Sequence, residues 1–414
     1  MNILFIASNY PFPADSGHNL RTFNMLRILA KEHTIFFVGF TKPHHREHAA
    51  PDDPIPALCK SIDLFTIPDD ESTVRLLWSL FLNLFSRFPY VIKKYYRSET
   101  EKRIQEILKT HSIDLVHVDI LHVSMYAHRI AAIPRALTEH NIESLRVKRL
   151  AQNAKNPLLT LYLYLQYKKL FAYEKQACTL FDLCVAVSKN DLQVLQHMNP
   201  SGRMIEVPNG VDTEHFSPAP DAWEPGSLLW VGSMHDLYNR EAVDYFCSEI
   251  FPRIEEEIPA VSFTAIGSHP TNALKALAMR SASVRVQGYV ADVRPYFSAA
   301  SVFLAPLKSG GGTKLKVLNA LSLGKAVVTT RVGAEGIDVE DGVHLVIADD
   351  PTSFAQKTIE LLRNPEKIKT MGEKGRQRIL ERYDWSAIGK IQLNAYRELV
   401  RSRISAPDQS PVFL

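Results

Sequence analysis

One stretch, Ser309 to Thr330, constrains the fold more than any other part of the chain, and it reads SGGGTKLKVLNALSLGKAVVTT. The apolar run at 302–305 precedes it and predicts a buried strand. Three glycines follow, which allow backbone to come close to a ligand. Residues 314–323 have the leucine spacing of a helix, which Thr313 can cap, and 326–330 predicts a returning strand. Strand, loop, helix and strand in this order indicate a parallel α/β sheet.

The same stretch predicts an anion site. Free N–H groups and the positive dipole end at a helix start attract anions, and Lys314 and Lys316 add two ammonium groups in the first turn. Cations at the N-terminal end destabilise an isolated helix, so a bound anion would explain why two lysines occur in this turn. The alternative is that both lysines reach solvent. Lys316 and Asn319 share one helix face, so a nucleoside diphosphate with its ribose one turn further along fits the spacing.

Composition narrows the class of protein. The 414 residues suffice for two or three domains. A net charge of +3 is too mild to imply a nucleic-acid partner. The four cysteines form no CxxC pair, which fits a reducing compartment and argues against a zinc site. The start of the chain reads as a strand rather than a signal peptide, and no apolar run reaches the roughly 18 residues of a membrane span. We therefore expect a cytoplasmic protein, at most peripheral on the inner face of a membrane.

The N-terminal residues predict a second parallel sheet. A strand at 2–8, a loop, a helix at 19–32 and a strand at 35–40 make a βαβ unit. Gly17 lies near the carboxyl end of the first strand, where ligands bind in open parallel sheets, or it is an ordinary turn glycine. His140 follows another strand end, and it either meets a ligand or is a structural histidine.

An apolar, aromatic helix is expected at about 76–88, followed closely by six cations: Arg87, Lys93, Lys94, Arg97, Lys102 and Arg103. Apolar aromatics beside a basic cluster can dock on anionic lipid. The alternative is a core helix followed by a solvated one. His44, His45 and His48 are interpreted as part of a solvated loop, because no carboxylate or cysteine pattern completes a metal site.

The chain divides into tandem domains. We expect an N-terminal Rossmann-like domain at 1–198, a proline-rich linker at 199–226 and a C-terminal Rossmann-like domain at 227–385. A final helix at about 386–402 should pack back on the first domain, before a flexible tail at 403–414. The expected fold class is α/β, two parallel sheets facing across a cleft, where ligands usually bind.

Several motifs carry a resemblance to a known family. They are VPNGVD at 207–212, LLWVGSM at 228–234, GYVADVRPYFSAASVFLAPL at 288–307, the stretch 309–330 with VGAEGI up to 337, and more loosely NYPFPADSG, TEHN and AVS in the N-terminal half. The chain resembles the family 4 glycosyltransferases of the two-Rossmann-domain GT-B fold. The resemblance covers nearly the whole chain, and the block 288–337 is its most specific part.

The resemblance implies transfer of a sugar from a nucleotide diphosphate sugar to an acceptor hydroxyl, with retention of anomeric configuration and without a metal. The C-terminal domain would hold a UDP- or GDP-sugar as donor substrate, with no separate cofactor. The residues implied to meet the donor's nucleotide and phosphates are Ser233, Asn239, Gly310, Gly311, Gly312, Thr313, Lys314, Lys316, Asn319 and Glu335. Gly17, His140 and Lys316 would act at the transferred sugar and leaving phosphate, and a glycan or lipid-linked acceptor of the cell envelope or an exopolysaccharide would bind the N-terminal domain.

Two departures from the family pattern concern the site. The family often has two glutamates with seven residues between them, and Gly311 and Asn319 stand in their places. An amide still donates and accepts hydrogen bonds but lacks charge-assisted strength, which costs on the order of 1 kcal/mol at the ribose. The family's Arg and Lys after the first strand of the C-terminal domain are also replaced, by MHDLYNR at 234–240.

Two other functions stay open at this point. A nucleotide-sugar epimerase of the same fold would need clustered acids in the N-terminal domain, for which the sequence offers Asp15, Asp119 and Glu139. A catalytically silent nucleotide-binding homologue would be compatible with Asn319. An Asp-x-Asp metal motif is absent from the sequence, and Asp338-Val339-Glu340 is interpreted as a solvated loop.

Overall fold

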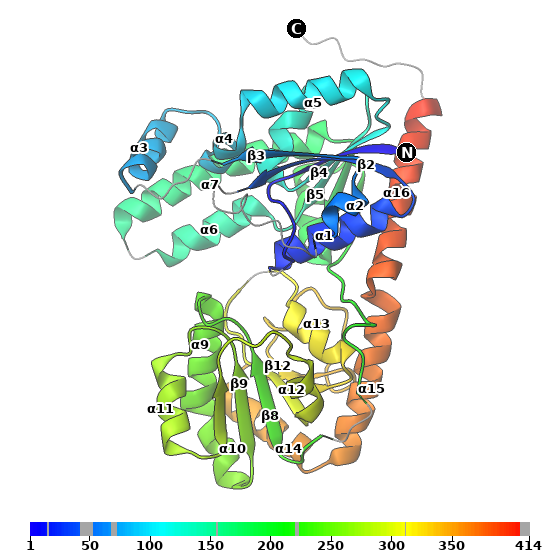
Figure 1. Cartoon of the computed structure of the whole chain (residues 1–414). Coiled ribbons are helices and arrows are strands. Elements are labelled where there is room, and N and C mark those ends of the chain that lie inside the picture. Colours follow the sequence, from blue (N-terminus) through cyan, green and yellow to red (C-terminus); the bar gives the residue numbers. More distant parts are fainter. Residues whose placement is uncertain are drawn as a thin grey trace. The chain divides into compact units, whose positions relative to one another are not determined.

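The computed structural model describes residues 1–14, 16–41, 53–67, 73–154, 156–219, 223–310 and 312–405, and the chain divides into two compact units. The first unit comprises Met1–Val207 and the chain from Gly389 onward, and the second comprises Pro208–Ile388. Each unit has its own parallel sheet with helices packed on it (Figure 1). The expected α/β class, with two Rossmann-like domains, is confirmed.

The first unit contains a seven-stranded sheet in the order β3-β2-β1-β4-β5-β6-β7. Its strands are β1 (Asn2–Ala7), β2 (Thr34–Thr41), β3 (Ser61–Thr66), β4 (Leu115–Asp119), β5 (Arg135–Glu139), β6 (Leu183–Ala186) and β7 (Met204–Glu206). Its helices are α1 (Gly17–Ala30), α2 (Ile55–Leu58), α3 (Thr73–Leu84), α4 (Tyr90–Tyr95), α5 (Ser98–Thr110), the 3-10 helix η2 (Leu121–Ala127), α6 (Glu143–Asn153), α7 (Pro157–Leu180) and α8 (Lys189–Met198). The direction of winding reverses between β1 and β4, which are neighbours in the sheet.

The second unit contains a six-stranded sheet in the order β10-β9-β8-β11-β12-β13. Its strands are β8 (Ser227–Val231), β9 (Ser262–Ile266), β10 (Val284–Gln287), β11 (Val302–Ala305), β12 (Ala326–Thr329) and β13 (Val346–Ile347). Its helices are α9 (Leu237–Tyr245), the π-helix η3 (Phe246–Ile250), α10 (Phe251–Glu257), α11 (Asn272–Arg280), α12 (Arg294–Ala299), α13 (Leu315–Ser322), α14 (Pro351–Leu362) and α15 (Pro365–Arg382). Here the winding reverses between β8 and β11.

Strand alternation divides the side chains of β4 between the two faces of the first sheet. Val116 and Val118 of β4 point into the main hydrophobic core, which includes Leu170 of α7. His117 and Asp119 alternate with them and therefore face the opposite side. There Thr22 of α1 bonds Asp119, and Tyr396 of α16 (Trp385–Ser405) bonds His117.

The expected linker at 199–226 starts too early. β7 lies within it and pairs in parallel with β6, and the first unit continues to Val207. A strand of three residues, 204–206, is too short to show an alternation of apolar and polar residues, and prolines surround it in the sequence. The sequence pattern therefore assigns the strand to the linker. The last helix, α16, begins in the second unit and ends in the first, and it runs three residues past the expected end at 402.

Some expected features fall outside the described residues, namely His44, His45 and His48, Asp15, Gly311 and the tail beyond Ser405. Among the helices that the structure describes, none combines the length and apolar character needed to cross a membrane.

Candidate functional site

In the first unit, polar residues gather at the carboxyl ends of β1, β4 and β5. Ser8 follows β1, Asp119 ends β4 and His140 follows β5, and the register places Ala7 beside Asp119. The chain reverses its winding between β1 and β4, and such a switch point is where open α/β sheets bind ligands. Ile120, next to Asp119, has a φ of 115°, a conformation that is costly for a β-branched residue and is found mainly at functional sites.

A chain of hydrogen bonds connects these residues. Ser8 Oγ lies 3.3 Å from His18 Nε2, and His18 Nδ1 lies 3.1 Å from His140 Nδ1. His140 Nε2 then lies 2.9 Å from Asp119 Oδ1. With Asp119 ionised and both rings neutral, one assignment of tautomers satisfies every contact: Ser8 donates to His18, His18 to His140 and His140 to Asp119.

Burial and neighbouring charges keep the His18 ring neutral and the Asp119 carboxylate ionised. The pKa of His18 falls to about 4, chiefly because burial disfavours the charged ring and because His140 lies beside it. Burial by itself would raise the pKa of Asp119, but His140 and His117 outweigh it and hold that pKa well below its usual range. Thr22 Oγ1 also donates to Asp119 Oδ2 at 2.5 Å.

This geometry changes what was expected of His140. Both of its ring nitrogens are engaged within the protein, and the residue is 9% exposed. His18 is the more exposed of the two rings. The predicted role of His140 beside a sugar therefore needs His18 to move or to make the contact itself. His18 was not singled out from the sequence, although it immediately follows Gly17.

Gly17 is the first residue of α1 rather than part of a turn, and it is exposed. Ser16 caps the helix, accepting a hydrogen bond from the Asn19 N–H. A glycine in the first turn exposes backbone N–H groups without a Cβ in front of them. This is the geometry that close approach of an anionic group requires.

Asp119 and Glu139, two of the acids that an epimerase would use, do not come together. Asp119 pairs in register with Thr138, so Glu139 faces the opposite side of the sheet. Glu139 is fully buried, and burial followed by repulsion from Glu174 raises its pKa well above the ordinary value. Asp119 and Glu139 thus belong to two different layers of the unit, for which the alternation of strand residues is the physical reason.

In the second unit, Lys316 connects α13 to the end of β8. Its Nζ donates to Asn239 Oδ1 at 2.6 Å and lies 4.9 Å from the centre of the Trp230 ring. Gly232 permits this approach, because a Cβ there would lie 2.5 Å from the same nitrogen. Burial lowers the pKa of Lys316 to about 7, with Asp236 opposing the shift and Lys314 adding to it.

The start of α13 differs in one respect from the expectation. Lys314, not Thr313, is the N-cap residue, because the first helical hydrogen bonds run from Val317 and Leu318 N–H to the Lys314 carbonyl. Within the described residues no side chain caps this end, and the buried Thr313 Oγ1 has no hydrogen-bond partner there. Lys314 Nζ bonds the Gly312 carbonyl at 2.7 Å and so holds the loop.

The other expected donor-site residues also follow strands of this sheet. Ser233, after β8, bonds Ser268 through the two hydroxyls at 3.0 Å, and its carbonyl accepts from Asn239 Nδ2 at 2.8 Å. Glu335 lies in the turn after β12 and is partly buried. Gly310, after β11, has a φ of 112°, which a side chain would strain. Asn319 is partly buried one turn along α13.

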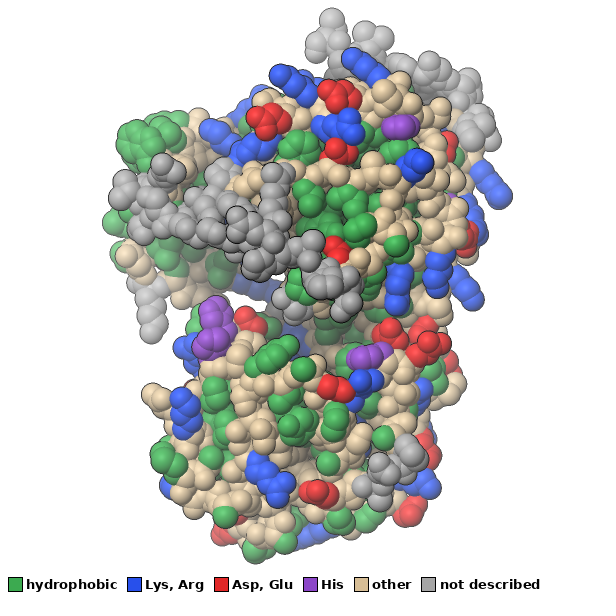
Figure 2. Space-filling model, in the orientation of Figure 1, with side chains coloured by type: hydrophobic (Ala, Val, Ile, Leu, Met, Phe, Trp, Pro, Cys, Tyr) green, Lys and Arg blue, Asp and Glu red, His purple; other side chains and the backbone are tan. Residues whose placement is uncertain are grey.

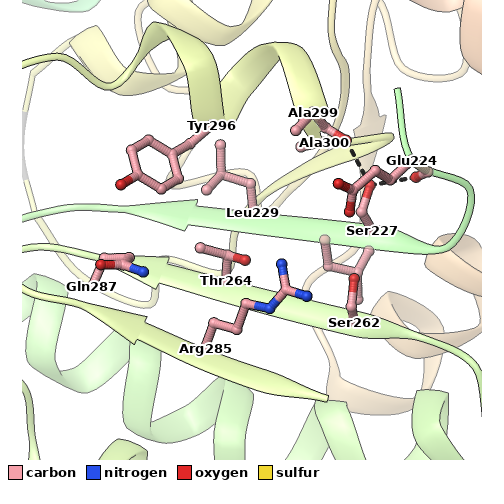
Figure 3. Close-up of a pocket in the computed structure, with 11 residues that line it drawn as sticks. Glu224, Ser227, Leu229, Ser262, Thr264, Arg285, Gln287, Tyr296, Ala299 and Ala300 are labelled. Carbon is pink, nitrogen blue, oxygen red and sulfur yellow. Dashed lines mark hydrogen bonds between the residues drawn. The ribbon is translucent and has the colours of Figure 1, made fainter. Parts of the chain in front are cut away.

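A separate pocket of about 100 Å³ lies elsewhere in the second unit (Figure 3). Thr264, Arg285 and Tyr296 line it, and it extends to Ser227, the first residue of β8. The pocket therefore reaches the amino end of β8, whereas the predicted donor-site residues lie beyond the carboxyl ends of the strands of this sheet. None of the predicted site residues lines it, so we do not assign it to the candidate site.

Sequence reasoning missed three residues that complete the two clusters: Thr22 and His18 in the first unit and Trp230 in the second. Trp230 and Thr22 lie inside a predicted strand and helix, where their side chains resemble ordinary core positions. Among the described residues, no group of three or more His, Cys, Asp or Glu side chains is placed to hold a metal ion. Metal independence stays a prediction.

Comparison with family models decides the family. Residues 16–215 match the model described as Glycosyltransferase Family 4, and residues 225–364 match the model described as Glycosyl transferases group 1. The chain belongs to the family 4 glycosyltransferases. The two matches divide this glycosyltransferase much as its two units do.

Curated relatives of the glycosyltransferase are distant in sequence. An uncharacterized 44.6 kDa protein in the cps region of Klebsiella pneumoniae is 21% identical over 92% of this chain and 96% of its own. A GDP-mannose-dependent alpha-(1-6)-phosphatidylinositol monomannoside mannosyltransferase from Mycolicibacterium smegmatis is 26% identical, over 46% of this chain and 55% of its own.

Solved structures share the fold. Sucrose-phosphate synthase from Thermosynechococcus elongatus superposes with a TM-score of 0.69 at 17% identity, covering 97% of this chain and all of that one. Anabaena HepE, solved in complex with UDP, gives 0.66 at 13% identity, covering 96% of this chain and all of that one. At such low identity these likenesses establish the fold of the glycosyltransferase and nothing finer.

His18→Gln is expected to reduce the loss of stability in acid. The unfolded chain protonates His18 as the pH falls through 6.5, whereas the folded ring stays neutral until about 4. Acid therefore favours unfolding, by roughly 1–2 kcal/mol for this ring near pH 5. Urea midpoints of wild type and variant at two pH values, one neutral and one near 5, measure the difference.

The matched control is His197→Gln, which changes an exposed histidine of α8 and should lose as much stability in acid as the wild type. Equal losses for His18→Gln and wild type would contradict a neutral His18 in the folded protein.

Proposed function

We propose that the protein is a retaining glycosyltransferase that moves a sugar from a nucleoside diphosphate sugar, UDP- or GDP-linked, to a hydroxyl of a glycan or lipid-linked acceptor. The observation that carries the proposal is the start of α13. It offers uncapped N–H groups, the glycine loop and the Lys316 ammonium at the switch point between β8 and β11. These are the elements of a diphosphate site.

The chemistry of the leaving group supports this assignment. Negative charge grows on the diphosphate as the glycosidic bond breaks. Fixed N–H dipoles and an ammonium aimed at that charge stabilise the transition state more than the ground state. In the front-face route that the family resemblance implies, the departing phosphate takes the acceptor proton, so no carboxylate nucleophile and no metal is needed.

The acceptor is proposed to bind the first unit, where Gly17, His18 and His140 gather near the carboxyl ends of β1 and β5. Relatives suggest its class, since one bears the name of a phosphatidylinositol mannoside mannosyltransferase and another that of a protein in a cps region. A role in envelope or exopolysaccharide synthesis in the cytoplasm, at the inner membrane surface, follows as a proposal.

A donor screen tests the function. Purified protein is incubated with UDP-, GDP- and ADP-sugars and a set of glycan and lipid-linked acceptors, and donor-dependent nucleotide release is measured with and without EDTA. Release with one donor, unchanged by EDTA, is expected, and the product should keep the donor's anomeric configuration. Absence of turnover with every pair, or release of nucleotide without any acceptor, would reject the transferase.

Nucleotide affinity is expected to fall as the pH rises from about 7 to about 9, by up to about fiftyfold, because the protonated fraction of an amine with a pKa near 7 falls from about one half to about one hundredth. The pKa of Lys316 is about 7 in the free protein, so binding a diphosphate at higher pH must first protonate the amine. The nucleotide itself keeps its full charge over this range, since phosphate titrates near 6. Calorimetric titration with UDP or GDP measures the slope.

Lys316→Met should weaken binding near neutrality and flatten that slope. The control is Lys308→Met, because Lys308 belongs to the same loop but lies 4.5 Å over the Tyr245 ring. If the pH dependence of affinity persisted in Lys316→Met and vanished in Lys308→Met, the anion would bind near Lys308 rather than Lys316.

Asn319→Glu is expected to tighten nucleotide binding by about fivefold, because a carboxylate makes charge-assisted bonds to ribose hydroxyls that an amide cannot. Asn319→Gln is the matched control, since it lengthens the side chain without adding charge. Equal affinity of the two variants would contradict a ribose at this position. Activity in Asn319→Glu with none in the wild type would identify a silent homologue.

A further inference from the structure

Helix α3 of the first unit exposes an apolar face. Trp78 is 61% exposed, and Phe85, directly after the helix, is 80% exposed. Phe81 connects them, with ring centres 5.7 Å from Trp78 and 5.6 Å from Phe85. Leu77 and Leu82 are also exposed. The structure thus contradicts the interpretation of this segment as a core helix and leaves a surface that water does not favour.

The hairpin of α6 and α7 exposes a second set of large apolar side chains. They are Leu150, Leu158, Leu159, Leu161, Tyr164, Leu165 and Phe171. Hydrogen bonds join α3 to this hairpin. Gln166 Nε2 of α7 donates to Asn83 Oδ1 at 2.8 Å, and Lys169 Nζ donates to the carbonyls of Asn83 and Leu84 at 2.7 and 3.1 Å. α3, α6 and α7 lie on the same side of this unit (Figure 1). We call them the α3/α7 surface.

Charge is distributed very unevenly around this surface. Residues 73–98 and 143–181 together contain twelve Lys and Arg against two acids, Glu143 and Glu174, which are both buried. These two segments therefore carry a net charge of +10 and leave −7 for the rest of a chain whose total is +3. Figure 2 shows hydrophobic side chains gathered where α3 lies in Figure 1, with blue Lys and Arg side chains close by.

Two hollows flank α7 and differ in character. One, of about 570 Å³, is lined by Arg87, Phe88, His128, Lys168 and Tyr173, among others. The other, of about 600 Å³, is mostly apolar and is lined by Pro157, Leu161 and Tyr164, among others.

Two cations of the first hollow, Arg87 and Lys168, are held against aromatic rings. Arg87 lies 4.8 Å over the Phe88 ring and Lys168 lies 5.4 Å over the Tyr164 ring. Neither forms an ion pair with a carboxylate of the described residues. Their charges therefore stay available to an outside anion.

We propose that the α3/α7 surface docks on a lipid bilayer that contains anionic phospholipids. Aromatic and leucine side chains would enter the boundary between headgroups and acyl chains, and the surrounding lysines and arginines would meet the headgroup phosphates. A protein partner could cover the apolar residues, but the excess of cations favours an extended anionic surface. The inference does not depend on the proposed transferase activity, because lipid binding is measured without turnover.

Co-sedimentation with sucrose-loaded vesicles tests the proposal on the full chain. Vesicles of phosphatidylcholine alone are compared with vesicles that contain about one third phosphatidylglycerol. Wild type should bind the anionic vesicles at least tenfold more tightly and lose most of that binding at high salt. Trp78→Ser with Phe85→Ser, and separately Arg87→Glu with Lys168→Glu, should each weaken binding at least tenfold.

Matched controls lie in the second unit. Met279→Ser with Tyr289→Ser removes two apolar side chains that are each 82% exposed, and Lys275→Glu with Lys369→Glu reverses two exposed lysines. Both should bind vesicles like the wild type, and thermal melting checks that every variant folds. Equal binding to neutral and anionic vesicles, or wild-type binding by both α3/α7 variants, would overturn the proposal. The proposal would also be overturned if the protein bound no vesicles and instead formed a dimer that Trp78→Ser with Phe85→Ser dissociated. The surface would then bind a second copy of the chain.

Discussion

Parallel strand pairing is the constraint on which both clusters of candidate site residues depend. It sends the carboxyl ends of β1, β4 and β5 to one edge of the first sheet and those of β8, β11 and β12 to one edge of the second. At each switch point the connections leave in opposite directions, which opens space above the strand ends. Side chains that are more than a hundred residues apart, such as His18 and His140, meet for this reason.

The two units stabilise a buried charged side chain in different ways. In the first, a buried carboxylate, Asp119, is satisfied by hydroxyl and imidazole donors, and burial lowers the pKa values of the nearby His18 and His117. In the second, the ammonium of Lys316 contacts an amide oxygen and an aromatic face, and burial weakens its hold on its proton. A site of the first kind can orient a hydroxyl, whereas one of the second gains most from an anion. This contrast matches the division between acceptor and donor that we propose.

The α3/α7 surface belongs to the same unit as the histidine chain. If the acceptor is lipid-linked, the unit proposed to bind it also carries the apolar and basic side chains suited to a bilayer. Net charge by itself gave little sign of this, because +3 over 414 residues is the sum of a strongly basic part and an acidic remainder. The location of the cations, rather than their number, sets the electrostatic attraction to a membrane.

The sequence by itself determined the α/β class, the strand–glycine loop–helix unit and the family, because these depend on local periodicity, glycine positions and short motifs. It did not determine the cap of α13, the edge strand β7 or the contact between His18 and His140. A cap depends on which carbonyl begins the helix, and an edge strand of three residues depends on its neighbour. The pairing of two histidines, the enclosure of Lys316 and the exposure of α3 were decided only by the tertiary structure, since burial and long-range contacts exist only once the chain has packed.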